Sequence, residues 1–426
     1  MRVEYGYAGV GTCTGFGRAY DPSHSNLASM NRILLIPAVL LFGAMAQAQD
    51  WNQKADLAGD PRWGACGFSI GTKGYVALGT DGSGNHGDLW EWDQATNTWT
   101  PKADFPGGDR REGGAFSIGA FGYVTCGRTA TSGTYYNDLW RYDPNTDSWT
   151  EKASLPAPTR SSPGVFVLNG KAYLMGGNPG PEPYYNDLWE YDPIADTWTQ
   201  RADLPATGRS VGIAFSSGGK GYVGSGADNS SNNACKDFWE WDPLTDSWAQ
   251  KADIPGPERR AACAFELFGQ GYVGSGWDGT NYFTDFYRYD TATDTWTPIA
   301  DFSGAGAYLM VPFPIGDNKA YVATGGTSGG GTTQLWEYAA ASPIGVDEAT
   351  TSSTITPIWS ANDLWLQGWT SGAGDRFELY DHVGHLVASD IVRGQKIALP
   401  PLAAGAYPFV LSGREGQRTV WTLAKP

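Results

Sequence analysis

The sequence predicts an all-β fold, a six-bladed β-propeller that is closed by an N-terminal outer strand and followed by a small C-terminal β-sandwich. Three observations predict the propeller. A tryptophan recurs at nearly constant spacing, each interval contains four short strand-like segments, and no segment has helical periodicity. The recurring tryptophans are Trp51, Trp99, Trp149, Trp198, Trp248 and Trp296.

The two outer strands of each unit are visible in its aromatic pattern. The recurring tryptophan is followed by a basic residue, an alanine and usually an aspartate, as in segment 99–104. Before it lies a segment such as 88–93, Asp-Leu-Trp-Glu-Trp-Asp, in which apolar and polar residues alternate. This alternation is typical of a half-buried strand.

The two inner strands are marked by a tyrosine and a glycine. A short apolar segment such as 114–118 precedes a Gly-Tyr-Val-like strand, and a glycine follows four residues after the tyrosine. Glycine at a strand end permits a positive φ angle and a close approach of the backbone. The tyrosines are Tyr75, Tyr123, Tyr173, Tyr222, Tyr272 and Tyr321, and the glycines are Gly79, Gly127, Gly177, Gly226, Gly276 and Gly325.

These features resemble the kelch repeat, whose blades have a glycine-ended second strand, an aromatic third strand and a tryptophan on the outermost strand. The resemblance covers residues 50–340 and implies a β-propeller. The kelch Gly-Gly doublet is present at Gly176 and Gly177 and, shifted by one residue, at Gly325 and Gly326. In the other copies Leu, Cys or Ser replaces the first glycine.

The two ends of the repeat region complement each other. The last unit stops after Tyr338 without a tryptophan strand, whereas segment 51–57 is a tryptophan strand without the three strands that precede it elsewhere. We therefore expect residues 51–57 to form the outermost strand of the sixth blade. This arrangement closes the ring and leaves no long open edge.

The chain has 426 residues, a formal net charge of −16 and an isoelectric point of about 4.6, and it contains no run of Lys or Arg. Nucleic acid and anionic membranes are therefore poor partners on electrostatic grounds. The five cysteines form no CxxC pair, so we expect neither a metal site nor a redox centre. Cys66 and Cys263 are expected to be small core residues, with a Cys235–Cys263 disulfide as the alternative.

Segment 30–48 has the three parts of a secretory signal peptide: a positive start at Arg32, an apolar run over 33–43 and an Ala-Gln-Ala end. The apolar run is too short to span a bilayer. Because a signal peptide normally begins at the initiator methionine, residues 1–29 are interpreted as a non-native upstream extension, with a native cytoplasmic leader as the alternative. We expect an exported chain that begins at Gln49 and has no transmembrane segment.

After the propeller, at 49–340, the composition changes to an Ala-, Ser- and Thr-rich linker at 341–357 and then to new strands at 358–426. Segments 377–387 and 402–411 resemble the C-terminal sorting domain of type IX secretion, although its Pro-Asn-Pro opening is missing. The resemblance implies a Gram-negative cell, a secreted or outer-surface location, and the secretion machinery as a partner. An ordinary accessory β-sandwich is the alternative.

Arginines repeat with the blades, thirteen residues before the tyrosine of the second strand. Near the mouth of the central channel, their planar donors would suit a carboxylate ligand. The alternative is structural, because each of these blades also repeats an aspartate that is available to pair with the arginine. The arginines are Arg62, Arg110, Arg160, Arg209 and Arg259, with Tyr308 in the last blade, and the aspartates are Asp88, Asp138, Asp187, Asp237 and Asp285.

Residues that break the repeat are better candidates for function than residues that keep it. Charged residues outside the strict repeat lie near the mouth at Arg111, Glu112, Glu258 and Arg260. Aromatic faces on rigidly mounted loops suit sugar rings or a protein partner, unless they fold down to cap their own blades. The aromatic candidates for ligand binding are Tyr135, Tyr136, Tyr184, Tyr185, Trp277 and Tyr282.

Among the four histidines His86 alone lies in the propeller segment, which is too few for a two-histidine copper site and leaves little basis for a Ser-His-Asp triad. We therefore expect a binding module for a glycan or a cell-surface protein, without catalysis, cofactor or metal. Two alternatives remain. One is a metal-independent sugar epimerase or mutarotase resembling the kelch N-acetylneuraminate epimerases, with Glu112 and Glu258 as acid and base. The other is a structural component for adhesion or matrix.

Overall fold

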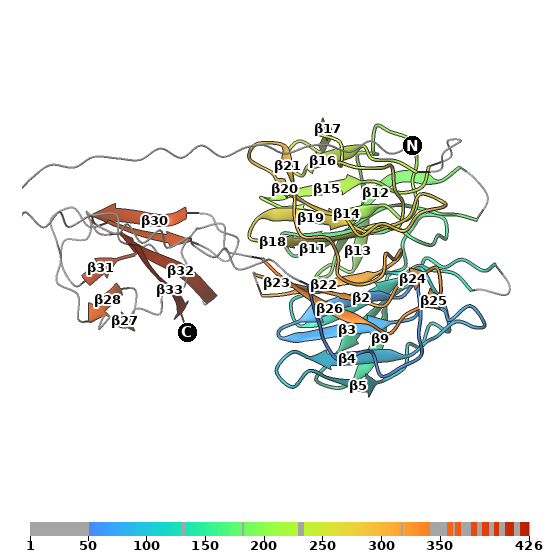
Figure 1. Cartoon of the computed structure of the whole chain (residues 1–426), viewed down its shortest axis with the longest axis horizontal. Helices are drawn as coiled ribbons and strands as arrows, with labels where there is room; N and C mark the ends of the chain where they lie inside the picture. The colour runs from blue at the N-terminus through green and yellow to red at the C-terminus, as the bar shows by residue number, and fades with distance from the viewer. Residues whose placement is uncertain are drawn as a thin grey trace, which may run out of the picture. The chain divides into compact units, whose positions relative to one another are not determined.

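The structure, a computed structural model, describes the propeller and the strands of the C-terminal region (Figure 1). The expected upstream extension and signal peptide, and residues 341–355 of the expected linker, lie outside the described residues. Every regular element of the described residues is a strand, which confirms the all-β fold, and none of them forms a helix long and apolar enough to cross a membrane. The described residues are 51–129, 133–180, 183–228, 234–316, 318–340, 356–360, 363–367, 376–380, 386–391, 396–399, 405–412 and 418–425.

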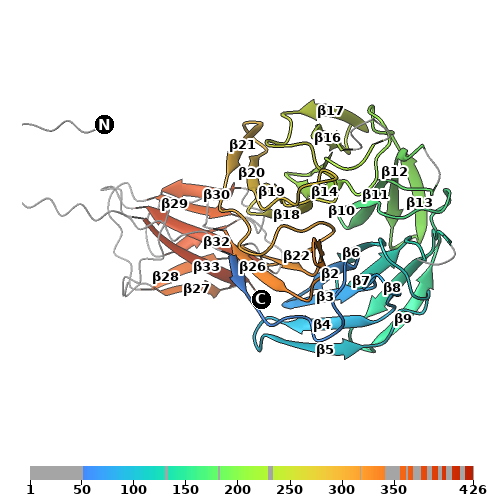
Figure 2. The ribbon, with the colours of Figure 1, turned by 45° about the vertical axis from the view of Figure 1, so that its right-hand side comes forward.

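Six antiparallel four-stranded sheets surround a central channel, which confirms the six blades (Figure 2). The strands of each blade are given from the channel outwards. Blade 1 contains β2 (Cys66–Ile70), β3 (Lys73–Ala77), β4 (Leu89–Asp93) and β5 (Thr98–Lys102); blade 2 contains β6 (Gly114–Ile118), β7 (Phe121–Thr125), β8 (Leu139–Asp143) and β9 (Ser148–Lys152); blade 3 contains β10 (Gly164–Leu168), β11 (Lys171–Gly177), β12 (Tyr185–Asp192) and β13 (Thr197–Arg201). Blade 4 contains β14 (Ile213–Ser217), β15 (Lys220–Gly224), β16 (Phe238–Asp242) and β17 (Ser247–Lys251); blade 5 contains β18 (Cys263–Leu267), β19 (Gln270–Gly274), β20 (Phe286–Asp290) and β21 (Thr295–Pro298); blade 6 contains β22 (Val311–Ile315), β23 (Lys319–Ala323), β26 (Leu335–Ala339) and β1 (Trp51–Gln53), with the short pair β24 (Gly326–Thr327) and β25 (Gly330–Gly331) between β23 and β26.

The N-terminal strand closes the ring, as the sequence predicts. β1 pairs antiparallel with β26, and Trp51 lies opposite Tyr338. Beyond β1, the backbone N–H of Leu57 donates to the carbonyl of Thr333 at 2.7 Å. Trp51 is buried, and its ring lies 4.9 Å from the ring of Phe286 in blade 5. The last blade is therefore assembled from both ends of the propeller segment.

Each blade is tied to the preceding one through the alanine that follows the basic residue. Between blades 1 and 2, the N–H of Ala103 donates to the Asp147 carboxylate at 2.9 Å, and its carbonyl accepts the indole N–H of Trp149 at 2.9 Å. The recurring tryptophans thus form a closed set of contacts around the ring. The other indole bonds join Trp51 to Ala300, Trp99 to Ala55, Trp198 to Ala153, Trp248 to Ala202 and Trp296 to Ala252, at 2.8 to 3.3 Å.

Aromatic packing fills the space between the inner strands. In blade 1, Phe68 stacks on Tyr75 with ring centroids 5.0 Å apart, and the Phe68 ring also faces Gly122 of blade 2. A Cβ atom at Gly122 would lie only 2.1 Å from this ring, so a side chain there would displace it. The glycine in the Gly-Tyr-Val pattern therefore reflects the close approach of a neighbouring blade.

The repeated arginines link neighbouring blades. At the end of the second strand of blade 2, Gly127 has a φ angle of +97° and donates its N–H to the carbonyl of Arg160 in blade 3 at 2.9 Å. The Arg160 guanidinium forms two hydrogen bonds with Asp187 of its own blade, at 2.6 and 2.9 Å. The same ion pairs join Arg62 to Asp88, Arg110 to Asp138, Arg209 to Asp237 and Arg259 to Asp285.

In blade 6, counting along the sequence assigns the wrong residue to the arginine position. Counting thirteen residues back from Tyr321 gives Tyr308, but the structure places Ala307 at that position. The turn between β22 and β23 spans 316–318 and is one residue longer than in blade 1, where it spans 71–72. As a result Ala307, and not Tyr308, accepts the N–H of Gly276 from blade 5, at 2.8 Å. Tyr308 instead takes the place of the residue that follows each arginine, which is a position at the channel mouth.

The C-terminal region contains two antiparallel sheets. One has the order β27 (Thr356–Ser360), β28 (Asp363–Gln367), β31 (Lys396–Ala398), and the other has the order β30 (Leu386–Ile391), β29 (Arg376–Tyr380), β32 (Gly405–Ser412), β33 (Arg418–Lys425). β27 begins inside the segment that the composition assigns to the linker. Phe377, Leu379 and Ile397 are buried, so these strands have an apolar interior of their own.

We expect deletion of residues 49–58 to lower the melting temperature sharply, because β26 loses its partner strand. Trp51→Ala alone should cost about 3–5 kcal/mol, as for other large aromatic side chains removed from a core. Thermal unfolding of the full chain, followed by circular dichroism, measures both effects. The control is Gln53→Ala on the exposed side of the same strand, which should change the free energy of unfolding by less than about 0.5 kcal/mol. An unchanged melting temperature after the deletion contradicts the closure.

The Arg209–Asp237 pair gives the arginine links a pH dependence. Burial by itself raises the pKa of Asp237, but the hydrogen bonds and positive charge of Arg209 outweigh burial and hold this pKa below its ordinary value. We expect Asp237→Asn to destabilise the protein by about 3–5 kcal/mol at neutral pH, because it leaves a buried guanidinium without its counter-charge.

The lowered pKa fixes the pH range of this effect. The stabilisation is fully present above the unfolded-state pKa of about 4 and is lost as the pH falls through the lower folded-state value. The difference in unfolding free energy between wild type and Asp237→Asn should therefore narrow below about pH 4. Denaturant unfolding at several pH values measures it, with the exposed Asp253→Asn as control. If the difference in unfolding free energy between wild type and Asp237→Asn stays constant down to pH 2, the stabilisation does not come from the charged form of Asp237.

Candidate functional site at the channel mouth

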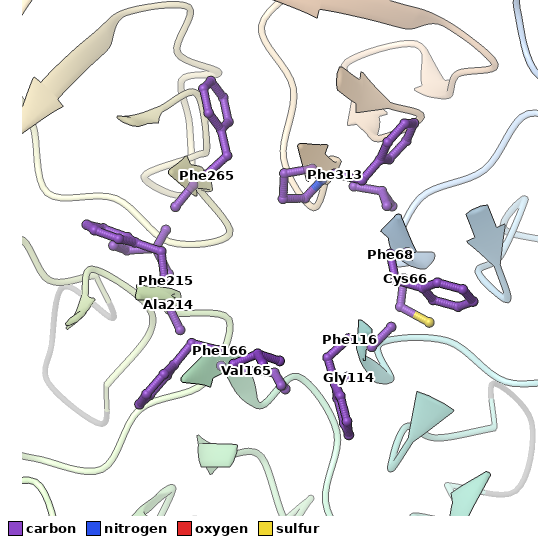
Figure 3. A pocket seen from close by; sticks show the side chains of 18 of the residues that line it. Cys66, Phe68, Gly114, Phe116, Val165, Phe166, Ala214, Phe215, Phe265 and Phe313 are labelled. Atoms are coloured by element: carbon purple, nitrogen blue, oxygen red, sulfur yellow. The ribbon is translucent and has the colours of Figure 1, made fainter. Parts of the chain in front are cut away.

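The central channel is lined by the six innermost strands and encloses about 380 Å³. Its lining consists mainly of small and apolar residues, with Glu266 as the one charged residue among them. The labelled phenylalanine rings in Figure 3 turn away from the opening and into the blades. They are Phe68, Phe116, Phe166, Phe215, Phe265 and Phe313. Apart from Glu266 and three serines, Ser69, Ser117 and Ser216, the side chains of the channel therefore offer few groups that would recognise a polar ligand.

One end of the channel is narrowed by a ring of six residues, one from each blade, around a space of about 100 Å³. All six have positive φ angles, and backbone hydrogen bonds of 2.6 to 3.1 Å connect them in order from blade 1 to blade 6. The ring residues are Gly64, Glu112, Ser162, Val211, Ala261 and Leu309. This ring is the floor of the channel mouth.

The residue before each ring position lies at the mouth and is paired with the loop that follows the second strand. In blade 5, for example, Arg260 and Trp277 exchange two backbone hydrogen bonds, at 2.9 and 3.0 Å. The loops are therefore mounted on the propeller by backbone bonds rather than by side chains alone. The six pairs are Trp63–Thr80, Arg111–Arg128, Ser161–Asn178, Ser210–Ala227, Arg260–Trp277 and Tyr308–Gly326.

Large side chains gather on one side of the mouth, over blades 5, 6, 1 and 2. The Arg111 guanidinium lies 4.7 Å from the ring of Trp63, and the Arg260 guanidinium lies 4.4 Å from the ring of Trp277. Tyr308 connects these two pairs, because its ring is 5.8 Å from the rings of both tryptophans. Tyr282 joins the group at 5.9 Å from Tyr308 and 6.1 Å from Trp277. We call Arg111, Trp63, Tyr308, Tyr282, Trp277 and Arg260 the aromatic–arginine arc.

The opposite side of the mouth is occupied by small side chains. The mouth positions of blades 3 and 4 are Ser161 and Ser210, whose loop partners are Asn178 and Ala227. Both serines are buried. The mouth is therefore asymmetric, with rings and guanidinium groups on four blades and small residues on two.

Glu112 is held by ion pairs at the edge of the arc. Its carboxylate accepts two hydrogen bonds from Arg128, at 2.8 and 2.9 Å, and lies 3.6 Å from Nε of Arg111. The hydroxyls of Ser161 and Ser162 donate to it at 3.4 and 3.2 Å. The Glu112 side chain is only 7% exposed. These contacts fix the carboxylate and place it between blades 2 and 3.

The mouth is partly desolvated, and this shifts the pKa values of two arc residues. Burial raises the pKa of Tyr308, and the charges of Tyr282 and Glu112 raise it further, while Arg111 opposes them. Burial also lowers the pKa of Arg111, as does the positive charge of Arg128, although Glu112 partly compensates. Electrostatic contacts to a ligand are stronger in such a place than in open water.

The repeated arginines lie outside the arc and point into the blades. Their guanidinium groups are buried against the aspartates, which is the structural alternative given by the sequence. Two of the loop aromatics cover these arginines: Tyr136 lies 3.6 Å from the Arg110 guanidinium and Tyr185 lies 4.3 Å from that of Arg160. These two rings thus cap their own blades.

The other sequence candidates divide between the arc and its surroundings. Trp277 and Tyr282 belong to the arc. Tyr135 pairs with Arg128 next to it, and Tyr184 lies on the blade 3 loop, outside the ring contacts of the arc. Sequence reasoning did not single out Trp63, although it stands directly after a repeated arginine, as Arg111 and Arg260 do.

The two glutamates proposed as acid and base lie on opposite blades. Glu112 belongs to the ring in blade 2, and Glu258 precedes Arg259 at the start of blade 5. Neighbouring innermost strands pack in the order β2, β6, β10, β14, β18, β22 and back to β2, so blades 2 and 5 face each other across the channel. Within the described part of the chain, no group of three His, Cys, Asp or Glu side chains is arranged to hold a metal ion.

Comparisons with known proteins agree with this architecture. The chain matches the Kelch motif over residues 159–205 and 276–303. A solved structure titled "Structure of YjhT" is similar, with a TM-score of 0.56 and 21% sequence identity over 66% of this chain and 96% of that chain, a likeness that concerns the fold. No curated protein matches the chain in sequence. The chain is therefore a six-bladed β-propeller that carries kelch motifs.

Proposed function

We propose that the protein is a binding module that holds a glycan at the channel mouth and carries out no reaction on it. The single observation that carries this proposal is the aromatic–arginine arc, in which four aromatic rings and two guanidinium groups line one side of the mouth. Aromatic faces pack against the apolar faces of sugar rings, and guanidinium groups donate to sugar oxygens.

The arc is suited to binding because its parts are ordered in advance. The tryptophans pack against arginines, and Trp63 and Trp277 are paired through their backbones with Thr80 and Arg260. Half-buried rings with few rotatable bonds lose little conformational entropy when a ligand binds. The arc thus combines side chains that differ from blade to blade with a backbone that holds them in fixed places.

The geometry favours binding over the epimerase alternative. A general acid or base must exchange a proton with the substrate, but the Glu112 carboxylate already accepts two hydrogen bonds from Arg128 and is almost fully buried. Glu258, the second candidate, belongs to the blade on the far side of the channel. A propeller also suits a protein partner, and a partner that binds through the same arc is the alternative tested below.

We also propose that the protein is exported and acts outside the cell or on its surface. This rests on the sequence features of segments 30–48 and 377–411. N-terminal sequencing of protein collected from the culture medium should give a chain that starts at Gln49. Recovery of mature protein that contains residues 1–29 contradicts the proposal.

We expect Trp63→Ala and Tyr308→Ala each to weaken glycan binding at least about tenfold, because each removes a ring from the centre of the arc. A glycan array with the full chain identifies the ligand, and isothermal titration calorimetry measures the affinity. The control is Ile194→Ala, which changes an exposed side chain on the hairpin between β12 and β13, at the strand ends remote from the mouth. This control should bind with unchanged affinity.

Other results would separate the alternatives. If the array shows no ligand, or if the arc variants bind like the wild type, the glycan proposal is wrong. Turnover of an acidic sugar in an anomerisation assay, abolished by Glu112→Gln, would support the epimerase instead. Because Glu112→Gln keeps the size of the side chain, a melting temperature close to that of the wild type shows that such a loss is chemical.

A further inference from the structure

We infer that the ligand of the mouth is an acidic oligosaccharide that carries at least two anionic groups and spans the channel mouth between Arg111 and Arg260. This inference rests on the proposed function and specifies the class of glycan. It depends on the placement of the two arginines, on their fixed orientation, on the local charge and on the rings that lie between them.

The two arginines occupy the same structural position in opposite blades. Each stands directly after a repeated arginine and directly before a ring residue, Glu112 in one case and Ala261 in the other. Blades 2 and 5 face each other across the channel, as the packing order of the innermost strands shows. A ligand with one anionic group reaches one arginine, whereas an elongated ligand with two such groups reaches both.

Each guanidinium is held over an indole ring. Arg111 lies over Trp63 at 4.7 Å and Arg260 lies over Trp277 at 4.4 Å. This contact uses the face of the guanidinium and is compatible with hydrogen bonds from its edge. The edge is the part that forms paired hydrogen bonds with a carboxylate. The two contacts therefore orient both arginines before a ligand arrives.

The charge of the side-chain cluster around Glu112 is opposite to that of the whole chain. The chain has a net charge of −16. At the mouth, Arg111 and Arg128 both contact the Glu112 carboxylate, which takes its two shortest hydrogen bonds from Arg128. This cluster of two arginines and one carboxylate is thus a positive spot on an acidic protein, and it attracts anionic groups to this side of the mouth.

The space between the two arginines is bordered by rings along blades 6 and 1. Tyr308 and Trp63 form this border, and Tyr282 from the loop of blade 5 contacts Tyr308. Over blades 3 and 4, the small residues Ser161 and Ser210 leave the other side without large side chains. Flat rings on one side and anion-binding groups at both ends match a chain of sugar acids, in which pyranose faces alternate with carboxylates.

The test uses the full chain and three probes in calorimetric titrations: tri-galacturonate, galacturonic acid and the neutral trisaccharide maltotriose. We expect tri-galacturonate to bind at least about tenfold more tightly than either of the others, because it alone engages both arginines and the rings. Arg111→Gln and Arg260→Gln should each reduce its affinity about tenfold, and the double variant should bind it no better than maltotriose.

Two controls separate local from general charge effects. Lys171→Gln removes a positive charge at the start of β11, at the strand ends remote from the mouth, and should leave the affinity unchanged. Arg260→Lys keeps the charge but loses the planar fork, so it should retain part of the affinity. Melting temperatures identify variants that fail to fold, and if Arg111→Gln is one of them, Arg260→Gln still decides the question because Arg260 contacts a loop residue of its own blade.

The outcomes distinguish this inference from the function on which it rests. Galacturonic acid that binds as tightly as tri-galacturonate, or arginine variants with unchanged affinity, overturn the inference. The inference is also wrong if maltotriose binds as tightly as tri-galacturonate. If that binding is lost in Trp63→Ala, the glycan-binding function still holds. If an acidic hexapeptide, titrated as a fourth probe, binds more tightly than every sugar, the ligand is a protein segment. If none of the probes binds, this inference is overturned, and the glycan array decides the function on which it rests.

Discussion

The fold depends on a contact between neighbouring blades in which the backbone N–H and the backbone carbonyl of one alanine both bind side chains of the next blade. The amide of Ala103 donates to Asp147 and its carbonyl accepts from Trp149, so one blade cannot slide along the next without losing both bonds. Asp147 has a φ angle of +47°, a conformation that Asp and Asn tolerate better than most residues. The alanine and the tryptophan therefore recur together with an aspartate, or with Asn97 in blade 1, and this contact explains why these three positions keep the fifty-residue rhythm.

Because the contacts between blades hold the propeller closed, the side chains at the channel mouth can differ from blade to blade. The ring residues at the mouth, such as Glu112 and Val211, have positive φ angles, which cost on the order of 1 kcal/mol for a residue with a side chain. Backbone hydrogen bonds between the blades offset this cost, since each ring residue from Glu112 to Leu309 donates to the one before it. The side chains next to the ring are not required for closure, and they differ from blade to blade.

The sequence alone reveals what repeats, and it reveals the site only in part. The closing strand and the Arg–Asp pairs follow from residues that recur in every copy or are missing from one. The arc does not follow from recurrence, because Trp63 and Tyr308 lie at opposite ends of the repeat region and meet only when the ring closes. Because the turn before Lys319 has one extra residue, counting thirteen residues back from Tyr321 also placed Tyr308 at the arginine position by mistake. Trp277 and Tyr282 were found because they are loop aromatics, and Trp63 was not, because it stands beside a repeated residue.

The site and the closure of the ring are connected. Trp63 belongs to blade 1 and Tyr308 to blade 6, so their contact crosses the junction at which β1 completes the last blade. Blades 6 and 1 are joined beside the two rings, where the N–H of Gly325 donates to the carbonyl of Arg62 at 3.0 Å, and again at the outer edge, where Trp99 donates to the carbonyl of Ala55 next to β1. A ligand that rests on both rings bridges this junction and favours the closed ring over any state in which β1 has separated. Under the proposed function, binding at the mouth and pairing of the N-terminal strand would therefore stabilise each other, although they lie at the inner and outer edges of the same blades.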